Sequence, residues 1–171
     1  MSDLSSLETS LGHAFSDKSL LTRALTHRSY LNENPDLPEL DNERLEFLGD
    51  AVLDFLTGDY LYNHFPEMHE GELTNLRSAL VKRETLALFA NALDLSEVLL
   101  ASRGERASGG HKRVATLAGT FEALVGALYL DAGVDAVRTF WEKFASPYLR
   151  LIVQEHLDRD AKSRLQELSQ S

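Results

Sequence analysis

The segment NERLEFLGDAVL, residues 42–53, places the carboxylates of Glu43, Glu46 and Asp50 in a stretch that is otherwise largely apolar. An α-helix turns by about 100° per residue, so these three side chains share one face if the segment is helical. Clustered carboxylate oxygens are the ligands that hard divalent cations such as Mg²⁺ prefer. The spacing is therefore compatible with one wall of a metal site, and also with an ordinary solvent-exposed helix face.

The apolar residues of the same segment lie on the opposite face of the helix. Leu45, Leu48 and Val52 fall about half a turn away from the acids at this spacing. Most surface helices of globular proteins show this pattern, so periodicity alone favours the solvent-exposed interpretation. Phe47 departs from the pattern, because it falls on the acidic side. A ring there needs to be covered by another part of the chain or by a second subunit.

A second candidate residue is Glu122, the only acid between Glu105 and Asp131. It stands among apolar neighbours that include Phe121 and Leu124. A carboxylate in such a helix needs a hydrogen-bonding partner or a cation if it is buried. The alternatives are that Glu122 points to solvent or pairs with a nearby Arg or Lys.

Helices must position these residues, because hydrophobic residues recur at helical spacing nearly throughout and no segment alternates as a strand does. We therefore predict an all-α fold. Turn-forming residues predict a loop over 32–42 and a glycine-rich basic loop over 101–113, with helix breaks near 82–84 and near Pro147. Helices are expected over 4–15, 16–31, 43–64, 70–95, 114–133 and 134–157.

Length and composition suit one globular domain, because 171 residues with 43% hydrophobic side chains can bury a core. We expect neither a membrane span nor a signal peptide, since no long apolar run or basic leader is present. The absence of cysteine excludes disulfides and thiolate zinc sites, and we expect a cytoplasmic location. The net charge of -10 argues against a generic polyanion binder. Bound divalent cations would reverse that charge locally.

With these segments in view, the sequence resembles the endonuclease domain of bacterial ribonuclease III. NERLEFLGDAVL is similar to the family's signature nearly residue for residue. The resemblance covers about residues 5–155 and implies a ribonuclease III endonuclease-domain-like helical fold over 1–155. It also implies a homodimer that cuts double-stranded RNA, with no membrane partner. The other matching segments are ALTHRSYLNEN (24–34), EGELTNLRSALV (70–81), SGGHKR (108–113) and FEALVGALYLD (121–131).

The resemblance also implies a Mg²⁺ site, with Mn²⁺ as a substitute, built from four carboxylates. Three of them carry over as metal ligands, namely Glu46, Asp50 and Glu122, and the last two are the implied catalytic residues. The family's fourth ligand is an Asp three residues before Glu122, where this sequence has Gly119. Glycine supplies no side-chain ligand, although water can occupy a position on Mg²⁺. We therefore expect weaker metal binding and slower cleavage, or none.

Further positions match with less specific roles. Glu43 and Glu70 correspond to acidic positions near the family's site, although solvated acids are the alternative. Phe47 corresponds to an aromatic residue that inserts into the partner subunit, which favours a dimer contact.

The basic loop over 101–113 is the expected RNA contact. It would hold backbone phosphates and 2′-hydroxyls through Arg106, Lys112 and Arg113. A plain surface loop is the alternative. The polar end, residues 156–171, resembles the linker and the start of the family's double-stranded RNA-binding domain, which we expect to be truncated here.

The implied reaction is phosphodiester hydrolysis by a metal-activated water, which leaves 5′-phosphate products with 3′ overhangs. The strongest rival is a catalytically inactive double-stranded RNA-binding or assembly module on the same fold, favoured by Gly119. A helical protein-interaction domain without an RNA role is favoured only by the acidic charge.

Overall fold

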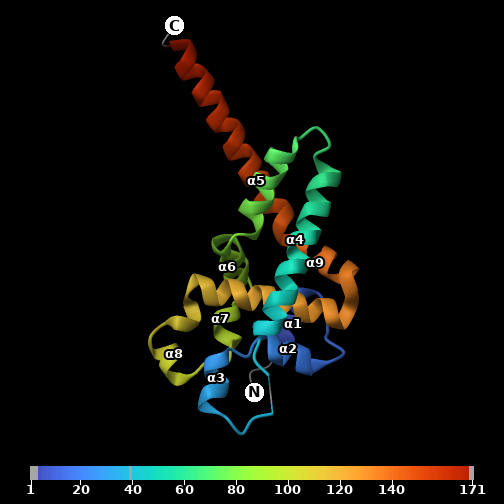
Figure 1. Ribbon diagram of the computed structural model, residues 1–171, viewed down its shortest axis with the longest axis vertical. Helices are drawn as coiled ribbons and strands as arrows, with labels where there is room; N and C mark the ends of the chain where they lie inside the picture. Colours follow the sequence, from blue (N-terminus) through green and yellow to red (C-terminus); the bar gives the residue numbers. More distant parts are fainter. Residues whose placement is uncertain (1–3, 39, 170–171) are drawn as a thin grey trace.

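The computed structural model describes residues 4–38 and 40–169, with side chains described as far as residue 154. Every regular element in this part of the chain is a helix, and the only extended pairing in it is an isolated bridge between Thr26 and Leu100. The prediction of an all-α fold is confirmed (Figure 1). The elements are α1 Ser5–Leu11, α2 Lys18–Ala24, α3 Arg28–Glu33, α4 Glu43–His64, α5 Glu70–Val81, α6 Arg83–Ala92, α7 Leu95–Val98, α8 Arg103–Ala107, the 3-10 helix η1 Gly110–Lys112, and α9 Val114–Ser169.

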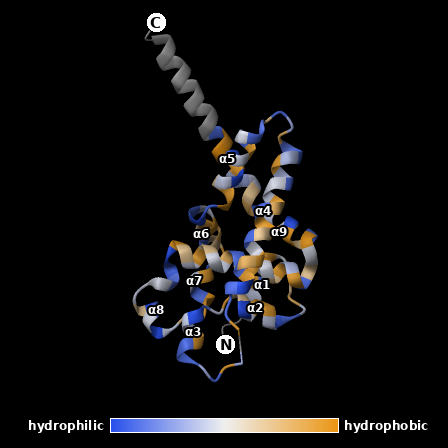
Figure 2. Cartoon of the chain, in the orientation of Figure 1, coloured by the Kyte–Doolittle hydropathy of each residue, from blue (hydrophilic) through white to orange (hydrophobic). Residues whose placement is uncertain are grey.

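The first half of α9 crosses the middle of the molecule and packs against α4 and α6 (Figure 1). Most of its apolar residues are buried, and Phe121 meets Phe89 of α6 and Trp141 of α9 in an aromatic cluster. Figure 2 shows hydrophobic residues along the central parts of these helices. The stretch 114–154 is long and apolar enough to cross a membrane, but 61% of its most apolar window is buried inside the fold. Its apolar residues are therefore already used in the core.

Several predicted boundaries are confirmed. Helix α4 begins at Glu43 and ends at His64, before Pro66, and the break between α5 and α6 falls at Lys82. Gly133 separates the two halves of α9 with a φ of 81°, a backbone conformation that glycine adopts without strain.

The predicted interruption near Pro147 is wrong, because the second half of α9 continues through this residue. Ala145 and Leu149, on either side of it, are buried in the core. Tertiary packing of these neighbours therefore outweighs the backbone hydrogen bond that proline cannot donate.

The single helix predicted over 16–31 is also wrong, because residues 25–27 leave the helical conformation between α2 and α3. The backbone N–H of His27 donates to the Leu100 carbonyl (2.9 Å), and the N–H of Leu100 donates to the Leu25 carbonyl (2.7 Å). This pairing joins segments far apart in the sequence, so local periodicity could not reveal it.

The loop predicted over 101–113 contains short helices, α8 and η1. Ser102 caps the start of α8, since its hydroxyl accepts a hydrogen bond from the backbone N–H of Glu105 (3.0 Å). The predicted division into a domain over 1–155 and a linker over 156–171 stays a prediction. The backbone of α9 runs to Ser169, but the side chains of 155–171 lie outside the described residues.

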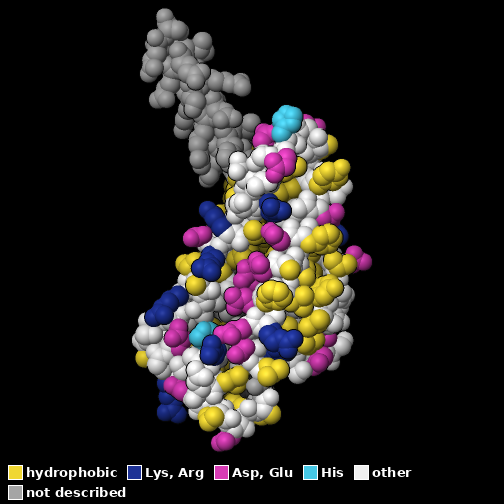
Figure 3. Space-filling model, viewed as in Figure 1, with side chains coloured by type: hydrophobic (Ala, Val, Ile, Leu, Met, Phe, Trp, Pro, Cys, Tyr) yellow, Lys and Arg dark blue, Asp and Glu magenta, His cyan; other side chains and the backbone are white. Residues whose placement is uncertain are grey.

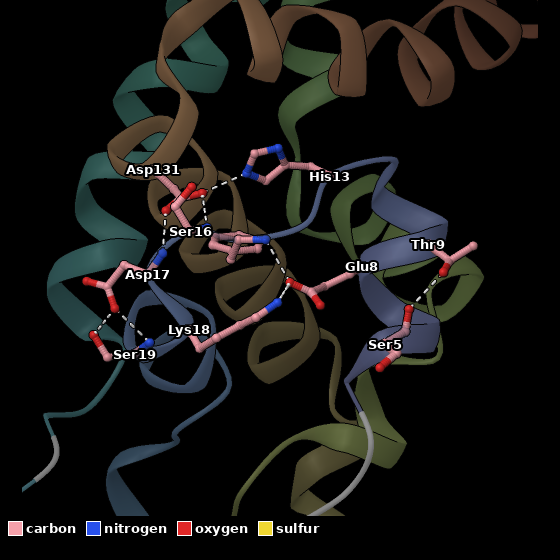
Figure 4. Close-up of polar contacts among 10 residues, drawn as sticks. Ser5, Glu8, Thr9, His13, Ser16, Asp17, Lys18, Ser19 and Asp131 are labelled. Atoms are coloured by element: carbon pink, nitrogen blue, oxygen red, sulfur yellow. Dashed lines mark hydrogen bonds and ion pairs between the residues drawn. The ribbon is translucent and has the colours of Figure 1, made fainter.

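A buried carboxylate ties the N-terminal segment to the end of the first half of α9 (Figure 4). Asp131 accepts hydrogen bonds from the backbone N–H groups of Ser16 (3.0 Å) and Asp17 (2.9 Å), and its carboxylate lies 2.7 Å from Nε2 of His13. Burial raises the pKa of Asp131, but these hydrogen bonds outweigh it and hold the pKa below its ordinary value. The contacts fix the chain two residues before its turn at Gly133.

Candidate active site

A cavity of about 730 Å³ lies where α4, the first half of α9 and the start of α6 meet. Glu46 and Asp50 line it from α4, and Glu122 lines it from α9. Glu43 and Gly119 are also part of its wall. Figure 3 shows acidic side chains gathered in the middle of this face, with Lys and Arg side chains around them and hydrophobic side chains gathered to their right. The structure thus brings the three predicted metal ligands to one cavity.

Two glycines explain how α4 and α9 come close enough to form this cavity. A β-carbon at Gly49 would lie 1.7 Å from the carbonyl oxygen of Glu122, and one at Gly126 would lie 2.3 Å from the carbonyl oxygen of Leu45. The two backbones therefore touch where the helices cross. Since Asp50 directly follows Gly49 along α4, this crossing sets the distance between the acids of the two helices.

We predict that Gly49→Ala destabilises the protein by about 3 kcal/mol, because the added methyl group collides with backbone that cannot move aside locally. Chemical denaturation would measure the loss. Gly58→Ala on the same helix is the matched control, since a β-carbon there meets nothing within 4 Å. It should be neutral or stabilising by up to about 1 kcal/mol. Equal stability of the two variants would contradict the close crossing.

The acids of the cavity are partly buried and repel one another. Burial, followed by the negative charges of Asp50 and Glu46, raises the pKa of Glu122 to about 7, although Arg83 opposes the rise. Burial, followed by the charge of Glu43, also raises the pKa of Glu46. Half-buried carboxylates that repel one another would be stabilised by a positive ion between them.

Glu122 should make stability depend on pH. Its pKa is about 7 in the folded protein and about 4.5 ordinarily, so the folded state binds more protons between these values. The free energy of unfolding should therefore fall as pH rises through this window, by on the order of 2 kcal/mol after allowing for solvent screening of a half-buried group.

Denaturation of the parent and of Glu122→Gln from pH 4 to pH 8, without divalent ions, measures this contribution. Glutamine cannot ionise, so the variant should be the more stable protein at pH 8, and the difference should vanish near pH 4. A difference that is independent of pH would contradict the raised pKa.

The Gly119 position is filled by its neighbour. An oxygen of the Glu46 carboxylate lies 2.7 Å from the place that a β-carbon of residue 119 would take. Glu46 therefore occupies the space that a side chain at residue 119 would take. Within the described residues, no three His, Cys, Asp or Glu side chains are grouped closely enough to hold one metal ion.

The two other predicted acids are placed differently. Glu43 lines the cavity and lies 3.5 Å from Arg28 in an exposed ion pair. Glu70 is not in the cavity wall: it begins α5, and its carboxylate accepts a hydrogen bond from the Thr74 hydroxyl (3.0 Å).

The basic residues predicted to bind RNA all have protein partners. Arg106 donates to the carbonyl of Leu99. The other two pair with acids, Lys112 with Glu97 (3.5 Å) and Arg113 with Glu105 (3.8 Å). Because the side chains of Lys112 and Arg113 are largely exposed, these ion pairs are weak and leave both cations available to another anion.

Phe47 is 80% exposed on α4, as expected of a residue that needs another surface to cover it. Phe55 (60%) and Tyr62 (74%) are exposed on the same helix. Phe47 also lines the acidic cavity, and the three exposed rings are spaced along α4 from there.

Sequence reasoning missed two parts of the site. Lys82 and Arg83 line the cavity, and the available signal was a pair of cations at the predicted helix break. Gly49 and Gly126 were missed because glycine inside a helix usually signals only weak helix propensity.

Comparison with known proteins agrees with this architecture. Residues 17–149 match the family model described as ribonuclease-III-like. Ribonuclease 3 of Syntrophobacter fumaroxidans is 48% identical over 98% of this chain and 71% of its own length. Ribonuclease 3 of Pseudomonas aeruginosa is 46% identical over 98% of this chain and 70% of its own length.

Solved structures give the same result. The nuclease domain of ribonuclease III from Campylobacter jejuni is similar with a TM-score of 0.78 and 40% identity, over 86% of this chain and 97% of that one. Dicer from Pichia stipitis is similar with a TM-score of 0.59 and 30% identity, over 80% of this chain and 57% of that one. The chain therefore belongs to the ribonuclease III family of endoribonucleases.

Proposed function

We propose that this chain hydrolyses phosphodiester bonds of double-stranded RNA in the cavity between α4 and α9, with Mg²⁺ or Mn²⁺ bound by Glu46, Asp50 and Glu122. The observation that carries the proposal is that carboxylates from two helices line one cavity, where burial, followed by the charges of Asp50 and Glu46, raises the pKa of Glu122 to about 7. Gly119 makes this an impaired version of the site, because it contributes no ligand.

The acids that line the cavity are the kind of ligand that a hard divalent cation prefers, although the described side chains are not grouped closely enough to hold an ion without rearrangement. They offer carboxylate oxygens, and their mutual repulsion would be relieved by positive charge. To hold an ion together with Asp50 and Glu122, Glu46 would have to rotate its long side chain away from Gly119. A bound divalent ion supplies charge stabilisation at the phosphate and lowers the pKa of the attacking water.

In the reaction, a water oxygen forms a bond to phosphorus, and the bond from phosphorus to the 3′ oxygen breaks. A proton from the water is transferred to the leaving oxygen, which becomes a 3′-hydroxyl. The water oxygen becomes part of the new 5′-phosphate. Asp50 and Glu122 line the same cavity from α4 and α9, so they would orient the groups on either side of the phosphate. Because the crossing is backbone on backbone, this orientation is rigid.

A second copy of the chain is the proposed partner. Phe47, Phe55 and Tyr62 present an apolar strip that a homodimer would bury. A solved structure of the Campylobacter jejuni nuclease domain is described as having a flexible region involved in dimer formation in that protein. Two sites would cut the two strands a short distance apart and leave 3′ overhangs. Sedimentation should show a dimer for the parent chain and a monomer for Phe47→Glu, and a monomeric parent would contradict the proposal.

RNA duplexes would be held mainly through phosphates, with Arg106, Lys112 and Arg113 as one contact region. Of these, Arg106 is tied most closely to the fold, so Lys112 and Arg113 should carry more of the salt dependence. We propose a cytoplasmic location for this activity.

A cleavage assay separates the proposed enzyme from its rival, an inactive duplex-binding module, which Gly119 favours. A labelled RNA duplex should be cut slowly in Mg²⁺ or Mn²⁺, with 5′-phosphate ends, and not at all with a chelator present. A gel shift in Ca²⁺ without cleavage in Mg²⁺ or Mn²⁺ would support the inactive module. No gel shift at low salt would refute an RNA role.

A further inference from the structure

Two cationic side chains line the acidic cavity at the junction between α5 and α6. Lys82 and Arg83 are both exposed, and both line the same cavity as Glu46 and Glu122. Arg83 is the closer electrostatic neighbour, because its charge lowers the pKa of both carboxylates. The cavity therefore has an acidic side on α4 and α9 and a guanidinium at the start of α6.

Arg83 is not held as a counterion by these acids. Within the described residues, its guanidinium has no carboxylate at ion-pair distance and no hydrogen-bond acceptor. Arg77, Arg113 and Arg138, in contrast, each pair with a carboxylate. A guanidinium that lines an acidic cavity without contacting its acids leaves room for something between them.

The chemistry of the two sides defines what fits between them. The carboxylates attract a cation, and a planar guanidinium with parallel N–H donors matches the oxygens of a phosphate. A phosphodiester lying between a metal ion and Arg83 would satisfy both sides at once.

We propose that Arg83 is a catalytic residue that binds the non-bridging oxygens of the scissile phosphate. This inference rests on the proposed function, since it assigns a new residue to the same cavity. Gly119 and Arg83 line the same cavity, so the charge that each side supplies bears on the other. With one carboxylate fewer, the site holds divalent charge less firmly, whereas a guanidinium carries its positive charge without needing ligands.

Arg83→Ala should therefore have opposite effects on metal binding and on catalysis. Removal of a positive charge facing the carboxylates should tighten Mn²⁺ binding several-fold, as read by titration. Single-turnover cleavage of a labelled RNA duplex should nevertheless slow by about 100-fold, the typical loss when one group that stabilises developing charge is removed. Arg83→Lys should recover part of the rate, because it keeps the charge but loses the paired donors.

The phosphate contact also predicts a loss of duplex binding in Ca²⁺, measured without cleavage. Arg83→Ala should weaken this binding and reduce the slope of its salt dependence by about one, the value for a single phosphate contact. Arg150→Ala is the matched control: this exposed arginine of α9 does not line the cavity, so cleavage and binding should be unchanged.

Three results would overturn the assignment. The first is an Arg83→Ala variant that cleaves as fast as a parent chain that is active. The second is weaker Mn²⁺ binding by Arg83→Ala than by the parent. The third is a loss of cleavage rate in Lys82→Ala equal to that in Arg83→Ala, which would indicate only a general charge effect. Failure of the parent to cleave would instead refute the proposed function. In that case, loss of Ca²⁺-supported duplex binding in Arg83→Ala would still support the phosphate contact, and retained binding would refute it.

Discussion

Gly119→Asp should cleave an RNA duplex in Mg²⁺ about 10- to 100-fold faster than the parent chain, as expected when a missing group is restored to a metal site. Residue 119 lies three positions before Glu122, so an aspartate there shares a helix face with it. Its β-carbon would lie 2.7 Å from an oxygen of the Glu46 carboxylate, which is too close for both to keep their places. Glu46 is long and flexible, and would turn away from residue 119 towards Asp50 and Glu122. The substitution therefore adds one ligand and redirects another.

Gly119→Ala is the matched control for this gain. Alanine supplies the β-carbon that displaces Glu46 but no ligand, and it strengthens the helix by up to about 1 kcal/mol. If alanine and aspartate accelerate cleavage equally, the position of Glu46 is what limits the parent. If neither does, three carboxylates are sufficient. Without metal, the aspartate variant should be less stable than the alanine variant, because it adds a carboxylate to acids that already repel one another.

Glu122→Gln should abolish cleavage, with a loss of about a thousandfold or more, since it removes the acid that α9 contributes to the cavity. Glutamine has nearly the same shape, so the crossing of α4 and α9 is preserved. The variant should also be more stable at pH 8, which separates lost chemistry from lost folding.

Single-turnover cleavage with enzyme in excess measures the Glu122→Gln effect. Glu67→Gln is the control, because Glu67 is exposed and does not line the cavity. Retention of more than about a tenth of the parent rate by Glu122→Gln would contradict a catalytic role for this residue.

The acidic face of α4 could be predicted from the sequence, because helical periodicity separates Glu46 and Asp50 from Leu45 and Val52. The association of that face with Glu122 could not come from periodicity, since it depends on which helices cross and where. The family resemblance supplied it, and the structure places all three acids in one cavity. Their role as metal ligands remains a prediction.

The parts that were missed depend on contacts between distant segments. The helix break at residues 25–27 is fixed by backbone hydrogen bonds to Leu100, about seventy residues later. The crossing of α4 and α9 depends on Gly49 meeting the backbone of Glu122. Arg83 enters the cavity because α6 begins there, and a cation at a helix break carries no local sign of what it faces.

Titration of the protein with Mn²⁺, followed by electron paramagnetic resonance of the free ion, tests most directly whether the carboxylates between α4 and α9 form a metal site. We expect the parent to bind Mn²⁺ weakly, Gly119→Asp to bind it at least tenfold more tightly, and Glu122→Gln to lose binding. Mn²⁺ binding that is unchanged by both substitutions would contradict a metal site in this cavity.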